Sequence, residues 1–229
     1  MKSTPLIFQD FSIAGLRKQW KWQYREEVII AKLRAGRPAP EWLSKDGCKT
    51  ETRRTRGLDK VNEFAYRWQF EQVTDEHYVF TNSKNYDKVL IKCPYGKIGD
   101  EIWVKESYKP LVTGGPEGFN LYDYKADVGS KSIADDIING WKSPMFMPKA
   151  ASRIKLEITG LSIERLWDID EEGPMREGCV FGFAEGDKEP NCKPIDQFIN
   201  RWKELHGKES LDKNPWVWVI QFTVKEFKQ

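Results

Sequence analysis

The sequence predicts an α+β protein built on a small mixed β-barrel with flanking helices. Many short runs of β-branched and aromatic residues are bounded by turn residues, which is typical of strands. Only a few segments have the spacing of apolar residues that indicates a helix. The two kinds of segment do not alternate in a βαβ rhythm, which disfavours a doubly wound parallel sheet. We expect residues 1–229 to form a single domain.

The N-terminal part is expected to hold a short strand and a long helical insertion. Residues 6–8 are an apolar strand candidate. Apolar residues then recur close to helical spacing over residues 12–33, and Lys and Arg occupy much of the other face. A glycine and two prolines within residues 35–40 end this helix. The stretch from about Lys18 to Lys45 is therefore predicted to be an insertion between the first strand and the rest of the fold.

Several strands are expected after the insertion. Residues 77–81 and 88–92 flank a polar turn, which predicts a hairpin. Polar and apolar residues alternate over residues 101–106, which indicates a half-exposed strand. Further strand candidates are residues 121–124, 152–160 and 216–224.

Two helices are expected in the C-terminal part. Asp170 is a candidate N-cap for a short helix that reaches about Gly178, with acidic residues in its first turn. A second helix is predicted over residues 194–205. Its apolar residues fall on one side at Ile195, Phe198, Ile199 and Trp202.

The charge and cysteine content exclude several classes of protein. The 37 Lys and Arg residues are nearly balanced by 35 Asp and Glu residues, so a nucleic-acid contact must come from a local basic patch. The four cysteines and two histidines lack the spacing of a zinc site, and no metal or other cofactor is expected. Scattered unpaired cysteines are typical of a reducing compartment. With neither a signal peptide nor an apolar run of membrane-spanning length, we expect a cytoplasmic protein without a membrane partner.

The most distinctive chemistry lies in residues 47–56, which contain four cations and three threonines. On an extended chain, alternate side chains share a face. One face would then hold Lys49, Glu51 and Arg53, and the other Thr50, Thr52 and Arg54. A turn or bulge would bring Lys49 to the Thr52 hydroxyl. A lysine whose pKa is lowered by burial or by neighbouring cations can activate a hydroxyl as a nucleophile. The alternative is a solvated basic loop.

Residues 47–54, with the sequence GCKTETRR, resemble the G-[RK]-K-T-x-T-x-R signature of ASCH domains, which belong to the PUA-like superfamily. Further landmarks resemble a phage and prophage branch of that family, and the resemblance extends from about Pro5 to Phe222 except for the insertion. These landmarks are residues 93–100, 102–106, 147–153, 177–178 and 214–218. The resemblance implies an open β-barrel with flanking helices and a cleft for RNA or a modified nucleoside.

The resemblance also implies an activity. Some bacterial ASCH proteins remove the acetyl group from N4-acetylcytidine with a lysine, a threonine and a glutamate, and others are ribonucleases. By motif, Thr52 would be the nucleophile, Lys49 its base and Glu177 the proton donor to the leaving amine. This chain is longer than the small amidohydrolases, and Arg53 stands where they tend to have an apolar residue. Because a second arginine adds phosphate affinity, Arg53 and Arg54 are expected to bind a nucleotide or polynucleotide.

Three residues outside this segment are further candidates for ligand contact. Trp103 could stack a base, although core packing is the alternative. Glu106 and Arg153 are expected to line the cleft, and for Glu106 a surface ion pair is the alternative.

The sequence leaves three functions open. The first is an ASCH protein that binds RNA or a nucleotide, with possible hydrolysis of a modified cytosine or of RNA. It requires Lys49, Thr52 and a carboxylate to converge within hydrogen-bond reach. The second is a non-catalytic nucleic-acid-binding module of phage origin. The third is a protein-interaction domain, in which the helix between Lys18 and Leu33 docks a protein partner through an exposed apolar patch.

Overall fold

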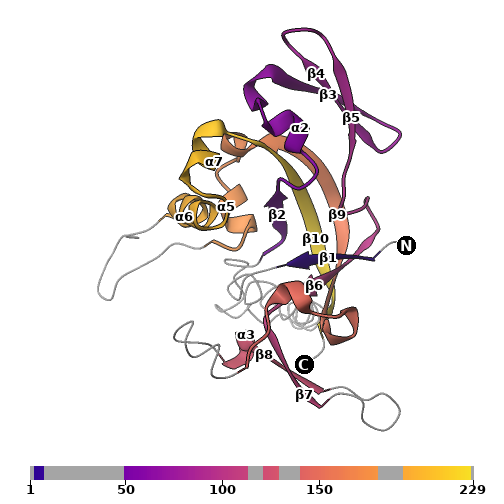
Figure 1. The fold of residues 1–229 in the computed structure, drawn as a ribbon, viewed down its shortest axis with the longest axis vertical. Coiled ribbons are helices and arrows are strands. Elements are labelled where there is room, and N and C mark those ends of the chain that lie inside the picture. The colour runs from indigo at the N-terminus through magenta and orange to yellow at the C-terminus, as the bar shows by residue number, and fades with distance from the viewer. Residues whose placement is uncertain (1–2, 8–48, 113–120, 129–139, 180–192, 228–229) are drawn as a thin grey trace, which may run out of the picture. The chain divides into compact units, whose positions relative to one another are not determined.

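The computed structural model describes residues 3–7, 49–112, 121–128, 140–179 and 193–227 (Figure 1). They form a mixed α+β structure, as predicted. The chain divides into two compact units. The described residues of the first unit lie within 3–7, 100–157 and 223–227, and those of the second within 49–99 and 158–222. The predicted insertion from Lys18 to Lys45 lies outside the described residues, so the protein partner assigned to its helix stays a prediction.

A five-stranded sheet has the strand order β1-β6-β9-β10-β2. Strand β1 (Ser3–Ile7) pairs in parallel with β6 (Glu101–Lys105), and β6 pairs antiparallel with β9 (Ile154–Arg165). Strand β10 (Trp216–Phe227) pairs antiparallel with β2 (Glu51–Arg54). Parallel and antiparallel pairs thus occur in one sheet, which confirms that the sheet is mixed.

The first unit adds a hairpin and short helical turns to its part of this sheet. They are β7 (Tyr108–Val112), β8 (Leu121–Tyr124), α3 (Lys125–Val128), η3 (Pro144–Phe146) and η4 (Lys149–Ala151). The half-exposed character predicted for residues 101–106 is wrong, because Ile102, Trp103 and Val104 are all buried. Three consecutive buried residues are typical of a strand that is covered on both faces.

The second unit contains a three-stranded antiparallel sheet, preceded by short helices. Its elements are α2 (Asp59–Asn62), η1 (Ala65–Arg67), β3 (Trp68–Thr74), β4 (His77–Asn82) and β5 (Lys88–Lys92). The β4–β5 hairpin was predicted and β3 was not. A bulge between Phe70 and Gln72 shifts the register of β3, so its apolar residues do not alternate regularly.

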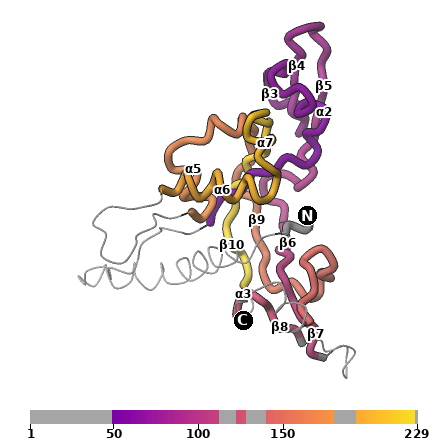
Figure 2. Tube along the Cα trace, turned by 60° about the vertical axis from the view of Figure 1, so that its left-hand side comes forward, coloured from indigo at the N-terminus to yellow at the C-terminus, as the bar shows by residue number. Residues whose placement is uncertain are grey.

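The helices of the second unit are the 3-10 turn η5 (Leu166–Asp168), α5 (Gly173–Arg176), α6 (Pro194–His206) and α7 (Lys208–Lys213). Both views show α5, α6 and α7 side by side (Figures 1 and 2). Phe198 and Trp202 of α6 pack in a core cluster with Leu211 and Val217, which confirms the predicted apolar side of this helix. Within the described residues, no helix has the length and apolar character needed to cross a membrane.

Helix α5 begins later than predicted. Its N-cap is Glu172, and Asp170 instead accepts a hydrogen bond from the Gly173 N–H at 2.6 Å. Pro174 lies in the first turn, which is where a helix tolerates the missing N–H of proline. The chain leaves the helix at Gly178, whose φ is +87°. A Cβ at this position would lie 3.3 Å from the Lys49 Cβ, so both the backbone conformation and the close approach favour glycine.

Candidate functional site

A buried ion pair joins Lys49 to Glu177 in the second unit. The Lys49 Nζ donates to the Glu177 carboxylate and, at 3.0 Å, to the Glu177 carbonyl oxygen. Lys49 is only 2% exposed and Glu177 only 8%. The backbone fixes this approach, because the Thr50 N–H donates to the Arg176 carbonyl at 2.8 Å. The segment before β2 is thereby tied to the last turn of α5.

The second oxygen of the Glu177 carboxylate is held by Arg53. The Arg53 backbone N–H donates to Glu177 Oε1 at 2.5 Å, and the Arg53 Nη1 lies 3.6 Å from the same oxygen. Both carboxylate oxygens of Glu177 therefore contact donors from residues 49–53. Such contacts orient the carboxylate.

A network of further charges surrounds Arg53. Its Nε donates to Glu164 at 2.6 Å, and its Nη2 lies 2.8 Å from Glu51. Glu51 also accepts from Arg176 at 3.1 Å, and Arg176 contacts both oxygens of Asp170 at 2.8 Å. Together with the Lys49–Glu177 pair, the network comprises the cations Lys49, Arg53 and Arg176 and the carboxylates Glu51, Glu164, Asp170 and Glu177.

Burial determines the electrostatics of this network. Burial lowers the pKa of Lys49, Glu177 opposes that effect, and Arg54 adds to it. Burial also raises the pKa of Glu164, although Arg53 opposes the rise. A lysine with a lowered pKa can give up its proton and act as a base. Beside a carboxylate that can take the proton, Lys49 is suited to acid–base chemistry.

Two buried atoms of the network lack a hydrogen bond within the described residues. They are Arg53 Nη1 and Glu51 Oε1. The Glu51 oxygen still has an ionic contact, since it lies 2.8 Å from Arg53 Nη2 without the alignment of a hydrogen bond. A buried donor without an acceptor is costly, so Arg53 Nη1 is a donor that an oxygen of a bound molecule can use.

Two further predicted site residues of the segment 47–56, Thr52 and Arg54, lie on β2. Thr52 is buried opposite Ile220, and Arg54 is half-buried opposite Trp218. Among the hydrogen bonds between described residues, none joins the Thr52 hydroxyl to Lys49. The structure thus brings together Lys49, Glu177 and Arg53 but does not join the predicted nucleophile to its predicted base.

Trp103, Glu106 and Arg153 belong to the first unit and form contacts of their own. Arg153 donates to both oxygens of Glu106, at 2.9 and 2.8 Å, and also binds Asp127. Its guanidinium lies 3.9 Å from the ring centroid of Tyr124. Glu106 is fully buried, so this ion pair is internal and not the surface pair weighed from the sequence. Trp103 is 8% exposed, in agreement with the core-packing alternative.

Sequence reasoning missed Glu51, Glu164 and Arg176 as members of the site. Glu51 occupies the variable position of the motif, and Glu164 lies near the end of β9. The contacts of Glu164 with Arg53 and of Arg176 with Glu51 join segments that are distant in the chain, so local spacing gives no signal for them. The contact of Glu51 with Arg53 is local and follows from strand alternation.

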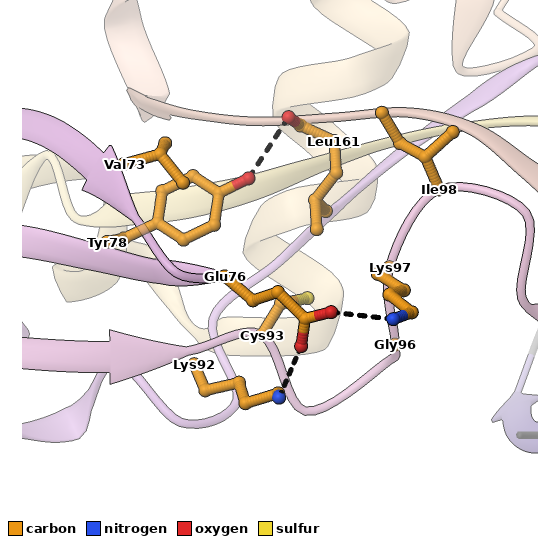
Figure 3. A pocket seen from close by; sticks show the side chains of 9 residues that line it. All are labelled: Val73, Glu76, Tyr78, Lys92, Cys93, Gly96, Lys97, Ile98 and Leu161. Atoms are coloured by element: carbon orange, nitrogen blue, oxygen red, sulfur yellow. Dashed lines mark hydrogen bonds and ion pairs between the residues drawn. The ribbon is translucent and has the colours of Figure 1, made fainter.

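A separate cavity of about 230 Å³ lies at the β3–β4 turn of the second unit (Figure 3). Glu76 binds Lys92 at 2.5 Å and Lys97 at 2.7 Å beside it, and the two lysines lower the Glu76 pKa to about 2. Burial raises the pKa of Cys93 to about 11, so its thiol is protonated at neutral pH and is no nucleophile. None of the predicted site residues lines this cavity.

Comparisons of the chain with protein-family models, with curated proteins and with solved structures find no match. Within the described residues, no cluster of His, Cys, Asp or Glu could hold a metal ion. The fold and the site therefore define a mixed α+β protein with a buried lysine–glutamate centre.

Proposed function

We propose that this chain is an ASCH protein of the PUA-like superfamily that binds RNA or a nucleotide. We further propose that Lys49 and Glu177 are the acid–base pair of a hydrolase acting on a modified nucleobase. One observation carries the proposal. The sequence resemblance assigns this lysine and this glutamate to one site, and the two side chains are in buried contact although 128 positions separate them. Strongly perturbed titratable groups with a specific charge partner are typical of functional sites.

The proposed reaction is hydrolysis of an exocyclic amide such as that of N4-acetylcytidine. The Thr52 oxygen attacks the carbonyl carbon, and its proton passes to neutral Lys49. When the tetrahedral intermediate collapses, the bond to the cytosine N4 breaks, and protonated Glu177 supplies the proton to the leaving amine. Water then hydrolyses the acyl-threonine ester and releases acetate. The buried Lys49–Glu177 contact supports these roles, since transfer of one proton from Lys49 to Glu177 prepares both groups.

The two arginines of the segment take different roles. The Arg53 guanidinium is buried among Glu51, Glu164 and Glu177, so it orients carboxylates and does not serve a phosphate. Its Nη1, which makes an ionic contact with Glu177 but no hydrogen bond within the described residues, is suited to an oxygen of the substrate. We therefore expect half-buried Arg54 and exposed Arg56 to bind the phosphate groups of the ligand.

A non-catalytic binding module is the second candidate. It is favoured by the absence of a hydrogen bond between the Thr52 hydroxyl and Lys49 among the described residues. Catalytic hydrogen bonds are often long before substrate binds and tighten only in the complex, so the hydrolase remains our first proposal.

The test is incubation of the protein with N4-acetylcytidine and with short single-stranded RNA. We expect the wild type to release acetate, and Lys49→Ala and Thr52→Ala each to lower the rate at least ~100-fold, because each removes a group that acts on the reacting atoms. Arg54→Ala should weaken RNA binding and reduce its salt dependence. RNA binding without turnover would leave the second candidate, and the absence of both would contradict the proposal.

A further inference from the structure

Three aromatic rings are exposed at one end of the three-stranded sheet of the second unit. Phe64 is 43% exposed, Tyr66 69% and Tyr86 79%. Aromatic side chains usually bury most of their surface, and a group of exposed rings marks an interaction site more often than single exposed side chains do. None of these rings contacts the Lys49–Glu177 pair, so the proposed reaction does not account for them.

Arg67 holds two of these rings in place. Its guanidinium lies 4.4 Å from the Phe64 ring centroid and 5.3 Å from that of Tyr66. Its Nε also donates to the Tyr66 hydroxyl at 3.1 Å, and the two rings meet edge to face with centroids 6.4 Å apart. We call Phe64, Tyr66 and Arg67 the aromatic platform. A surface that is already ordered loses little conformational entropy when it binds a ligand.

The turn between β4 and β5, which carries the third ring, is hydrogen-bonded to the segment of the platform. The Ser83 N–H donates to the Arg67 carbonyl oxygen at 2.7 Å, and Trp68 pairs with Asn82. Lys84 and Tyr86 are exposed on this turn. Tyr86 has a φ of +60°, a conformation that a bulky side chain adopts only where its surroundings impose it. The turn that carries this exposed ring and the Lys84 ammonium group is therefore joined to the platform segment through the backbone.

We infer that the aromatic platform, with Lys84 and Tyr86, is a stacking site for unpaired bases of a single-stranded nucleic acid. Exposed rings accept the face of any base, and a guanidinium can both stack and bind phosphate. The inference takes only its ligand class from the proposed function and concerns a surface outside the Lys49–Glu177 site. It implies that the protein also binds a modified base within a polynucleotide, beyond the free nucleoside used in the activity test.

The composition of the surface favours a nucleic acid over a protein partner. Residues 63–67 (EFAYR) and 83–87 (SKNYD) contain no Leu, Ile, Val or Met, so exposed rings alternate with charged groups and no contiguous aliphatic patch is formed. Carboxylates are present as well, at Glu63 and Asp87, and Asp87 accepts a hydrogen bond from Asn85. Because local charge is nearly balanced, stacking on the rings is the main expected contribution to affinity.

The test is fluorescence anisotropy with labelled oligonucleotides of about ten nucleotides, a length typical of such sites. The arms are single-stranded RNA, single-stranded DNA and the RNA duplex. We expect Tyr66→Ala combined with Tyr86→Ala to weaken single-strand binding about tenfold or more, and the salt dependence to stay unchanged because no cation is lost. Arg67→Ala should weaken binding and also reduce the salt dependence. The matched control is Phe146→Ala, since Phe146 is 72% exposed and lies in the first unit.

The outcomes separate this inference from the proposed function. If the double variant binds like the wild type while Arg54→Ala binds weakly, the platform inference is wrong and the proposed function stands. If the wild type binds no oligonucleotide but releases acetate from N4-acetylcytidine, the inference also fails and the hydrolase stands. Equal affinity for the duplex, or self-association of the wild type that Tyr66→Ala abolishes, would overturn the inference. Unchanged acetate release by the double variant, together with weakened RNA binding, would support it.

Discussion

Glu177→Ala is expected to lower the free energy of unfolding at neutral pH by about 3–5 kcal/mol, the usual cost of removing one partner of a buried ion pair. The Lys49 ammonium would keep its hydrogen bond to the backbone carbonyl of residue 177 but lose the carboxylate. The Arg53 backbone N–H would lose its acceptor as well. Denaturant unfolding of the wild type and the variant measures this difference.

The double variant Lys49→Met/Glu177→Leu is the matched control. It removes both charges and keeps similar side-chain volumes, so its stability is expected to lie between that of Glu177→Ala and that of the wild type, because the Arg53 N–H still loses its acceptor. If the double variant is as unstable as Glu177→Ala, the loss comes from packing and the ion-pair account is wrong.

The stability of Glu177→Ala should also depend on pH in a defined direction. Burial lowers the folded-state pKa of Lys49 below its ordinary value of 10.5, and without Glu177 nothing opposes that effect within the pair. Between the lowered pKa and 10.5 the unfolded chain binds more protons than the folded one, so the free energy of unfolding rises with pH across this window. A loss of stability that is constant up to pH 10.5 would contradict this explanation.

Arg53→Met is the second substitution expected to have a large effect. It would leave Glu51, which is 1% exposed, without its Arg53 contact and would remove the hydrogen bond to Glu164. We expect a loss of about 3 kcal/mol or more, because buried Glu51 would keep only Arg176 as a cation and Glu164 would lose its contact with Arg53. Reduced acetate release should accompany it, since the guanidinium helps to orient Glu177.

Lys88→Met is the control for Arg53→Met. The Lys88–Glu71 ion pair has a similar contact distance of 2.9 Å, but both side chains are exposed to solvent, at 58% and 37%. Exposed pairs contribute little to stability, so no clear change is expected. Equal losses for the two variants would show that burial is not the cause.

The sequence predicts an element correctly where the spacing of apolar residues depends on that element alone. Helix α6 has a stripe of apolar residues that packs in the core, and the helical spacing of these residues is evident in the sequence. The exposure of β6 was predicted incorrectly because it depends on what covers the two faces of the sheet, which local alternation does not encode. Strand β3 was missed because its bulge breaks the alternation.

The candidate site was likewise predictable only in the part that depends on neighbouring residues. The basic segment was recognisable from its own residues, and the alternation that puts Glu51 and Arg53 on one face holds in β2. The role of Arg53 was not predictable, because Glu164 and Glu177 reach it from positions 111 and 124 residues away. An arginine that suggests phosphate binding in the sequence is an internal counter-ion once these carboxylates surround it.

Acetate release from N4-acetylcytidine by the wild type and by Lys49→Met/Glu177→Leu tests the central claim most directly. The double variant removes both charges of the pair and is expected to stay folded, so a loss of activity would report on chemistry. The account predicts measurable release by the wild type and a decrease of at least ~100-fold in the double variant. Equal release by the two proteins would contradict the assignment of Lys49 and Glu177 as the acid–base pair.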